Sequence, residues 1–301
     1  MTNSISIHIF NYYDKNGYPL WKEPLLISDN NTRTWITDYS LIADKDNCTV
    51  ITFQDIRNHV GSPLDESDVF IYRISPIGEF LLGEDGVNIS PYRNLFTASP
   101  KICITNGGNY IVAWSAAEES FRDSIPDKCM VYVNKIDKEG NFLWENPIVL
   151  EDTLWQYIFP EVIPSGDDGF ILTWMQYKDK KRFGTLAWRY IHAQKYDAYG
   201  RPVWENDVAI FDMIGIPPNT FLIPEAKSDG NNGAIFVWRI GKGFKINIRS
   251  QHLSSEGIEK WKHNGINVCN DDQINQDYPS FDYNPTNKKL FVFGILIIMT
   301  M

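Results

Sequence analysis

Five short apolar runs recur along the chain, each bounded by polar turn residues. Each run has four to six residues and is rich in β-branched and aromatic side chains. A run this short favours a strand over a helix, and the lack of polar alternation predicts a strand covered on both faces. The runs are CTVITF, YIVAW, FILTW, AIFVW and LFVF, which end at Phe53, Trp114, Trp174, Trp238 and Phe293.

A second pattern precedes each apolar run: a turn glycine, followed four residues later by a tryptophan, as in DAYGRPVW. We expect the glycine to adopt a backbone conformation that side chains disfavour, and the preceding acid to accept hydrogen bonds from the turn amides. The tryptophan would then fill the gap between one structural unit and the next. The turn glycines are Gly17, Gly78, Gly140, Gly200 and Gly257, and the residues four positions later are Trp21, Leu82, Trp144, Trp204 and Trp261.

A third mark lies 14 residues before the aromatic end of every run: Tyr39, Pro100, Pro160, Pro224 and Pro279. The three marks define five repeats, at about 5–57, 68–118, 128–178, 186–242 and 245–301, each with four short strands joined by turns. Sheets standing side by side in a ring would cover both faces of the apolar strands. The sequence therefore predicts one all-β domain over residues 1–301, a β-propeller of four-stranded antiparallel blades, with five blades if the chain is complete.

The end of the chain tests this count. Polar residues follow the aromatic end of the first four runs, whereas the segment after Phe293 stays apolar. A ring of five blades requires this tail to be buried against the first blade, and an exposed tail would indicate a ring that belongs to a longer chain. The tail is too short to cross a bilayer as a helix, and we expect no membrane span.

The phrase D-x-x-G-x-x-x-W resembles the tryptophan-docking repeat of quinoprotein (PQQ-like) propellers, with a shorter turn and without the threonine. The whole repeat is more similar to repeats of bacterial secreted or surface β-propeller proteins, in which a proline, a DGxGG turn and an apolar strand ending in Trp follow. PEAKSDGNNGAIFVW (224–238) and PEVIPSGDDGFILTW (160–174) carry this resemblance, which covers essentially the entire chain. It implies an extracellular, surface or periplasmic location if a leader was removed, and otherwise a cytoplasmic one.

Charge and motif content narrow the range of functions. The chain has 28 Lys and Arg residues against 38 Asp and Glu, a formal charge of −10, which repels phosphate backbones and excludes nucleic acid as an expected partner. The four cysteines form no C-x-x-C pair, and no histidine pair has metal-ligand spacing. The acidic turns SGDDG and SDGNNG have the composition of hairpin turns. We therefore expect neither a metal ion nor a cofactor.

Repeats without a distinct catalytic motif favour a non-catalytic binding or scaffolding module, with a glycan or protein ligand, over an enzyme. Aromatic residues in or near the second interstrand loop of several repeats are the candidate ligand-binding residues, because flat apolar rings bind sugars and peptides well. The alternative is that these rings pack into the blade edges. They are Trp35, Phe96, Trp155, Tyr157 and Phe221.

Two glutamates support an alternative function, a glycan-acting hydrolase with carboxylates in a central pocket. Glu161 and Glu225 directly follow the recurrent proline in adjacent repeats, so both could face one pocket, as paired carboxylates must in glycoside hydrolysis. The other repeats have Ser40, Lys101 and Ser280 at this position, so no acidic ring is expected. Exposed strand glutamates are the simpler interpretation of both residues. A third possibility is an assembly platform of the periplasmic PQQ-like kind.

Overall fold

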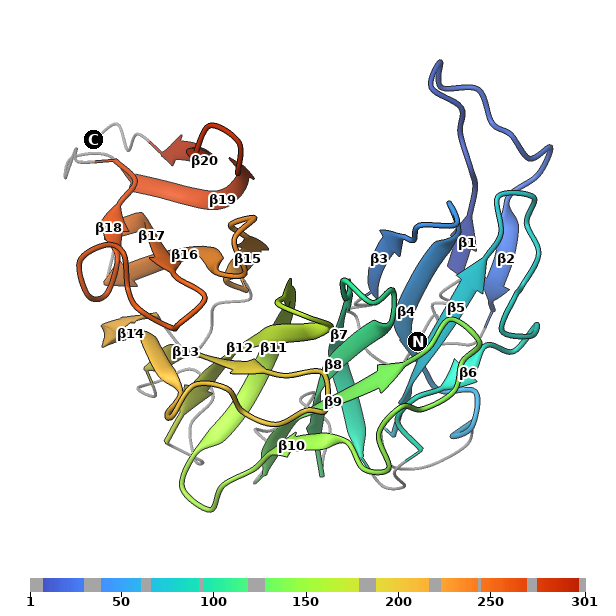
Figure 1. Cartoon of the computed structure of the whole chain (residues 1–301), viewed down its shortest axis with the longest axis horizontal. Helices are drawn as coiled ribbons and strands as arrows, with labels where there is room; N and C mark the ends of the chain where they lie inside the picture. Colours follow the sequence, from blue (N-terminus) through green and yellow to red (C-terminus); the bar gives the residue numbers. More distant parts are fainter. Residues whose placement is uncertain are drawn as a thin grey trace, which may run out of the picture.

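The computed structural model describes an all-β chain whose sheets stand side by side along an open arc (Figure 1). The described residues are 8–29, 39–60, 66–91, 95–118, 128–178, 188–216, 223–242, 245–269 and 275–297. Within these ranges there is no helix, and hence none long and apolar enough to cross a membrane. The protein is a β-propeller of four-stranded antiparallel blades, as the repeats predicted.

Four sheets are complete blades, each in the strand order of the chain. The first contains β3 (Tyr39–Ala43), β4 (Thr49–Asp55), β5 (Asp68–Ile74) and β6 (Val87–Asn88). The second contains β7 (Phe96–Ile104), β8 (Tyr110–Ala117), β9 (Cys129–Ile136) and β10 (Ile148–Leu150). The third contains β11 (Gln156–Ser165), β12 (Gly169–Tyr177), β13 (Arg189–Tyr196) and β14 (Val208–Ile216). The fourth contains β15 (Glu225–Ser228), β16 (Ala234–Lys242), β17 (Lys245–Leu253) and β18 (Ile266–Asn267).

Two further sheets have two strands each and lie at the two ends of the arc (Figure 1). They are β1 (His8–Phe10) with β2 (Leu25–Ser28), and β19 (Asn275–Asn284) with β20 (Lys289–Ile297). The blades are therefore offset from the sequence repeats by half a repeat. Each complete blade joins the last two strands of one repeat to the first two strands of the next.

The apolar runs are the second strands of the blades, and four of them are buried on both faces as predicted. Every residue of β4, β8 and β12 is buried, and in β16 the residues from Ala234 to Trp238 are at most 1% exposed. Their side chains contact those of the neighbouring blade. For example, the ring centroids of Trp238 and Phe211 are 5.7 Å apart. Face-to-face packing of the blades thus forms the core.

The fifth run, in β20, differs. Alternate side chains on one face of this strand are exposed: Phe291 by 58%, Phe293 by 71% and Ile295 by 49%. The described part of the tail is therefore not buried against the first blade, and Figure 1 shows the arc open between the two end sheets.

The turn glycines behave as the sequence predicted. All five have φ between +78° and +88°, and each amide donates to the carbonyl three residues earlier. In the repeats whose turn acid is an aspartate, its carboxylate accepts hydrogen bonds from backbone amides. For example, Asp197 Oδ1 accepts from the amides of Tyr199 and Arg201 at 2.9 Å each.

The phrase tryptophans connect one turn to the next. Trp21, Trp144 and Trp204 each lie against the turn glycine of the following repeat. Each indole Nε1 also donates to the carbonyl two residues before that glycine, at 2.9, 3.2 and 3.0 Å respectively. We call this combination the indole–turn contact. This contact fixes the distance between the outer hairpins of adjacent sheets.

Candidate active site

A β-bulge lies at the recurrent proline in the innermost strands of the second and third blades and in β19 of an end sheet. Pairing with the second strand shifts between Ala98 and Lys101, between Ile158 and Glu161, and between Asp277 and Ser280. The residue before each proline has a left-handed backbone conformation that non-glycine residues seldom adopt: Ser99 (φ 51°), Phe159 (φ 52°) and Tyr278 (φ 51°). Bulges and strained backbone of this kind occur near functional sites, where they redirect side chains.

Three of the residues that directly follow the recurrent prolines line one cavity of about 220 Å³. Glu161 from the third blade and Glu225 from the fourth both line it, together with Lys101 from the second. The two candidate carboxylates therefore share one cavity rather than standing separately on exposed strands. The remaining lining residues are Ile223, Pro224, Arg239 and Pro279.

Glu161 lies beside a cation. Lys101 Nζ is 3.3 Å from Glu161 Oε2, and both side chains are largely shielded from solvent, with 27% and 19% exposed. Burial raises the pKa of Glu161, Lys101 opposes that rise, and the negative charge of Glu225 adds to it. Glu225 is thus close enough to Glu161 for its charge to affect the ionisation of Glu161.

Glu225 has no ion pair among the contacts described for it. Burial raises the pKa of Glu225, and the more remote positive charges of Lys227 and Lys101 oppose the rise. Lys227 Nζ is itself 3.2 Å from Asp282 Oδ1. A hydrogen bond from the backbone of Phe281 also opposes the rise, so Glu225 differs from Glu161 in lacking a close cation.

Arg239, which also lines the cavity, pairs with an aspartate of the next sheet. Arg239 of β16 lies with Nε 2.7 Å from Oδ1 of Asp277 on β19, and both side chains are mostly buried. Neither residue is among the candidates that the sequence predicted. Only their positions in the repeat could have pointed to them. Arg239 directly follows the aromatic end of its run, and Asp277 lies two residues before the recurrent proline.

The three predicted aromatic ligand-binding residues that the structure describes do not line this cavity. Phe96 is buried on β7 with 6% exposed. Trp155 and Tyr157 are half-buried, and the Trp155 ring contacts Tyr190 and lies 4.6 Å from Lys178 Nζ. Trp35 and Phe221 lie outside the described residues.

The acidic turns use their carboxylates for contacts within the protein. Asp168 accepts from Lys135 Nζ at 2.6 Å and from the hydroxyl of Thr105 in the preceding blade. Asp229 accepts the amides of its own turn and lies 2.9 Å from His252 Nε2. Among the described residues, no group of three or more His, Cys, Asp or Glu side chains could hold a metal ion.

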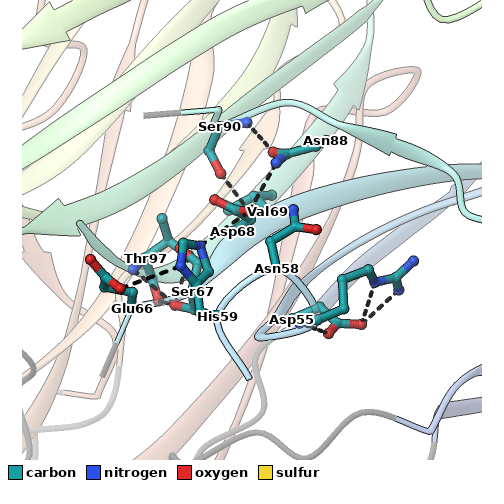
Figure 2. Close-up of polar contacts among 11 residues, drawn as sticks. Asp55, Asn58, His59, Glu66, Ser67, Asp68, Val69, Asn88, Ser90 and Thr97 are labelled. Atoms are coloured by element: carbon teal, nitrogen blue, oxygen red, sulfur yellow. Dashed lines mark hydrogen bonds and ion pairs between the residues drawn. The ribbon is translucent and has the colours of Figure 1, made fainter. Parts of the chain in front are cut away.

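A second polar cluster lies in the first blade, away from the lining of the cavity (Figure 2). Its centre is the buried Asp68, whose Oδ2 accepts from Asn58 Nδ2 at 2.7 Å and from Asn88 Nδ2 at 2.9 Å. His59 lies between two carboxylates, 3.3 Å from Asp68 and 3.4 Å from Glu66. These contacts join the end of β4 to β5 and β6, which indicates a structural role.

Comparison with known proteins gives the fold and a correction. No protein-family model and no curated protein matches the chain. Among solved structures, an endo-arabinase from Bacteroides thetaiotaomicron VPI-5482 is 11% identical over 90% of this chain and 96% of that one, with a TM-score of 0.43. A thermostable family-43 glycoside hydrolase is 14% identical over 81% and 83% of the two chains (TM-score 0.45), and a Trypanosoma rangeli sialidase is 9% identical over 99% and 57% (TM-score 0.46).

These structures contradict the prediction of a non-catalytic binding or scaffolding module and the expectation that the chain is not an enzyme, because all three are glycan-acting hydrolases. The alternative that the sequence left open, a glycan-acting hydrolase, is taken up below as a proposal. At these identities and TM-scores no residue or substrate is transferred, so the activity must be argued from the side chains of this chain.

Proposed function

We propose that this protein is a hydrolase that cleaves glycosidic bonds, with Glu161 and Glu225 as its two catalytic carboxylates. The observation that carries the proposal is that both carboxyl groups, from adjacent blades, line one cavity and both have pKa values raised by burial. Glycoside hydrolysis needs such a pair, with one group protonated and one ionised.

The surroundings of the two carboxyls assign their roles. Lys101 stabilises the charged form of Glu161, so Glu161 is the general base or nucleophile. Glu225 lacks a paired cation and is the general acid. Glu225 donates its proton to the glycosidic oxygen as the bond from that oxygen to the anomeric carbon breaks. A new bond to that carbon forms from water activated by Glu161, or from Glu161 itself before water replaces it.

The lining of the cavity fits part of a glycan, because prolines and Ile223 supply apolar surface beside the charged groups. The bulge at Phe159 lies two residues before Glu161 and is part of the strand that positions this carboxylate.

The test is release of reducing sugar from a broad panel of polysaccharides and oligosaccharides by the wild-type protein and three variants. Glu161→Gln and Glu225→Gln should each lower the rate by at least about a hundredfold, the usual contribution of a general acid or base. Glu139→Gln, at an exposed glutamate in an outer turn, should leave the rate unchanged. Failure of the wild type to cleave any glycan in the panel, or full activity of both cavity variants, would refute the proposal.

A further inference from the structure

The bulge in β11 is held by a side chain from another blade. Phe159, the residue before the recurrent proline, has φ of 52°. The pairing of β11 with β12 shifts register between Ile158 and Glu161, so Phe159 lies opposite no residue of β12. Its amide donates instead to Oγ of Ser115, on β8 of the second blade, at 2.9 Å. A hydroxyl of one blade thus supplies the acceptor that a bulged amide of the next blade needs.

The bulge in β19 has the same arrangement with one more residue in between. Tyr278 also precedes the recurrent proline with φ of 51°, and its amide donates to Asp277 Oδ1 at 2.9 Å. Arg239 of the fourth blade lies with Nε 2.7 Å from the same oxygen. Ser115 and Arg239 occupy equivalent positions, because each directly follows the aromatic end of its apolar run. At two junctions, therefore, this position contacts the bulge of the next sheet.

Ser115 is buried and lies outside the lining of the cavity. Its side chain is on a fully buried strand, with 2% of the residue exposed, and it is not among the cavity residues. A hydroxyl in this position can influence a bound substrate only through other residues. The residue that it contacts is near the reacting groups, because Glu161, the base or nucleophile of the proposed function, lies two residues after Phe159.

The second blade contacts this segment twice. Ser115 accepts the Phe159 amide, and Lys101 Nζ lies 3.3 Å from Glu161 Oε2. Both contacts come from the paired strands β7 and β8. A shift of the bulge relative to the second blade would therefore move the Glu161 carboxylate away from the cation that favours its charged form.

The ring of Phe159 is held from within its own blade. The guanidinium carbon of Arg189, a buried residue of β13, lies 5.4 Å from the centre of this ring. The hydrogen bond to Ser115 and the contact with Arg189 together fix both the backbone and the side chain of Phe159. Fixation from two sides is needed because a left-handed backbone is unfavourable for a residue with a Cβ.

We propose that Ser115 is a positioning residue: by accepting the Phe159 amide it sets the bulge that places the Glu161 carboxylate beside Lys101 in the cavity. The effect on catalysis rests on the proposed function, whereas the effect on the placement of Glu161 does not. Without the hydroxyl a buried amide loses its acceptor, and the bulge relaxes. A displacement of about 1 Å at a catalytic group can lower a rate by about a hundredfold.

Glycan cleavage by serine variants tests this role. Ser115→Ala should lower kcat about ten- to a hundredfold and leave KM within about twofold, because Ser115 does not line the cavity. The ascending limb of its pH profile should move to higher pH as Glu161 loses its contact with Lys101. Ser250→Ala is the matched control. It removes a buried hydroxyl that donates to the Phe236 carbonyl at 2.8 Å within the fourth blade, and should leave the pH profile unchanged.

Ser115→Thr and Ser115→Val form a second matched pair. Their side chains have the same shape, and only threonine retains the hydroxyl, so the two variants separate loss of the acceptor from a change in packing. Ser115→Thr should keep most of the wild-type kcat and exceed Ser115→Val at least about tenfold. Equal rates for the two variants would overturn the positioning role.

A titration of the Glu161 carboxyl by NMR needs no substrate. Its resonance is assigned by its loss in Glu161→Gln, and its pKa should be higher in Ser115→Ala and Ser115→Val than in the wild type, Ser115→Thr or Ser250→Ala. An unchanged titration in both hydroxyl-free variants would overturn the positioning role. If the wild type cleaves no glycan but the titration still shifts, the proposed function fails and the positioning contact stands.

Discussion

The indole of Trp204 lies flat against the turn glycine Gly257 of the next repeat, and its Nε1 donates to the carbonyl of Ser255 at 3.0 Å. A Cβ on Gly257 would come within 2.8 Å of the ring carbons. The position of the tryptophan therefore depends on the glycine, since any side chain at residue 257 would displace the indole.

Gly257→Ala should accordingly be more damaging than its small size suggests. The residue has φ of +79°, which costs an alanine about 1 to 2 kcal/mol, and the clash with Trp204 should add about 1 to 3 kcal/mol. Gly108→Ala, with φ of +86° and open space around its Cβ position, isolates the backbone cost. Urea unfolding of both variants measures the difference, and equal losses would mean that the Trp204 contact contributes nothing.

Glu225→Gln should stabilise the folded protein at neutral pH while abolishing activity. A carboxyl whose folded-state pKa is raised binds protons more tightly when folded, so its ionisation at higher pH lowers the free energy of unfolding. The neutral amide avoids that cost. The gain should be largest above the raised pKa and should fade as the pH drops toward the ordinary value of 4.5.

Chemical unfolding at several pH values measures this effect, with Glu139→Gln as the control for loss of an exposed carboxylate. A stability gain that does not depend on pH would show that removal of a buried charge is not its cause.

Lys101→Met should alter the pH dependence of glycan cleavage. Without the cation 3.3 Å from Glu161, burial raises the pKa of that carboxyl further, so the ionised base forms only at higher pH. The ascending limb of kcat/KM should move to higher pH, with a loss on the order of tenfold below it. Lys101→Arg, which keeps the charge, should retain most of the original profile. An unmoved ascending limb in the methionine variant would exclude Glu161 as the ionising base.

The polar cluster of the first blade should contribute to stability rather than to catalysis. Asp68→Ala removes the buried acceptor of the half-buried Asn88 amide and of the exposed Asn58 amide, which should cost about 1 to 3 kcal/mol. Glu79→Ala, at an exposed turn residue, should change stability by no more than about 0.5 kcal/mol. Thermal unfolding compares the two, and an intact Asp68 variant with lost activity would instead assign this cluster to the site.

The repeats predicted the strands and turns because these depend on local chemistry. Alternation between apolar runs and turn glycines is visible in the sequence, and the positive φ of Gly200 or Gly257 follows from it. The half-repeat offset could not be predicted, because a repeat gives the period but not which strands pair. Pairing depends on tertiary contacts between residues of different repeats, such as Trp174 with His192.

The candidate site was predicted in part for the same reason. Glu161 and Glu225 were found because they occupy equivalent places after a recurrent proline. The bulges could not be predicted, because the residue before a proline normally has an extended backbone, whereas Phe159 has a left-handed backbone conformation. The Arg239–Asp277 pair joins two blades, and only the circular order of the sheets brings them together.

The half-repeat offset has a consequence for how such a gene can grow. When every blade is shared between two successive coding units, duplicating one unit inserts a whole sheet and leaves each existing junction with a valid partner on both sides. The number of repeats can then change by recombination without leaving an unpaired strand inside the protein, so selection can act on the number of blades.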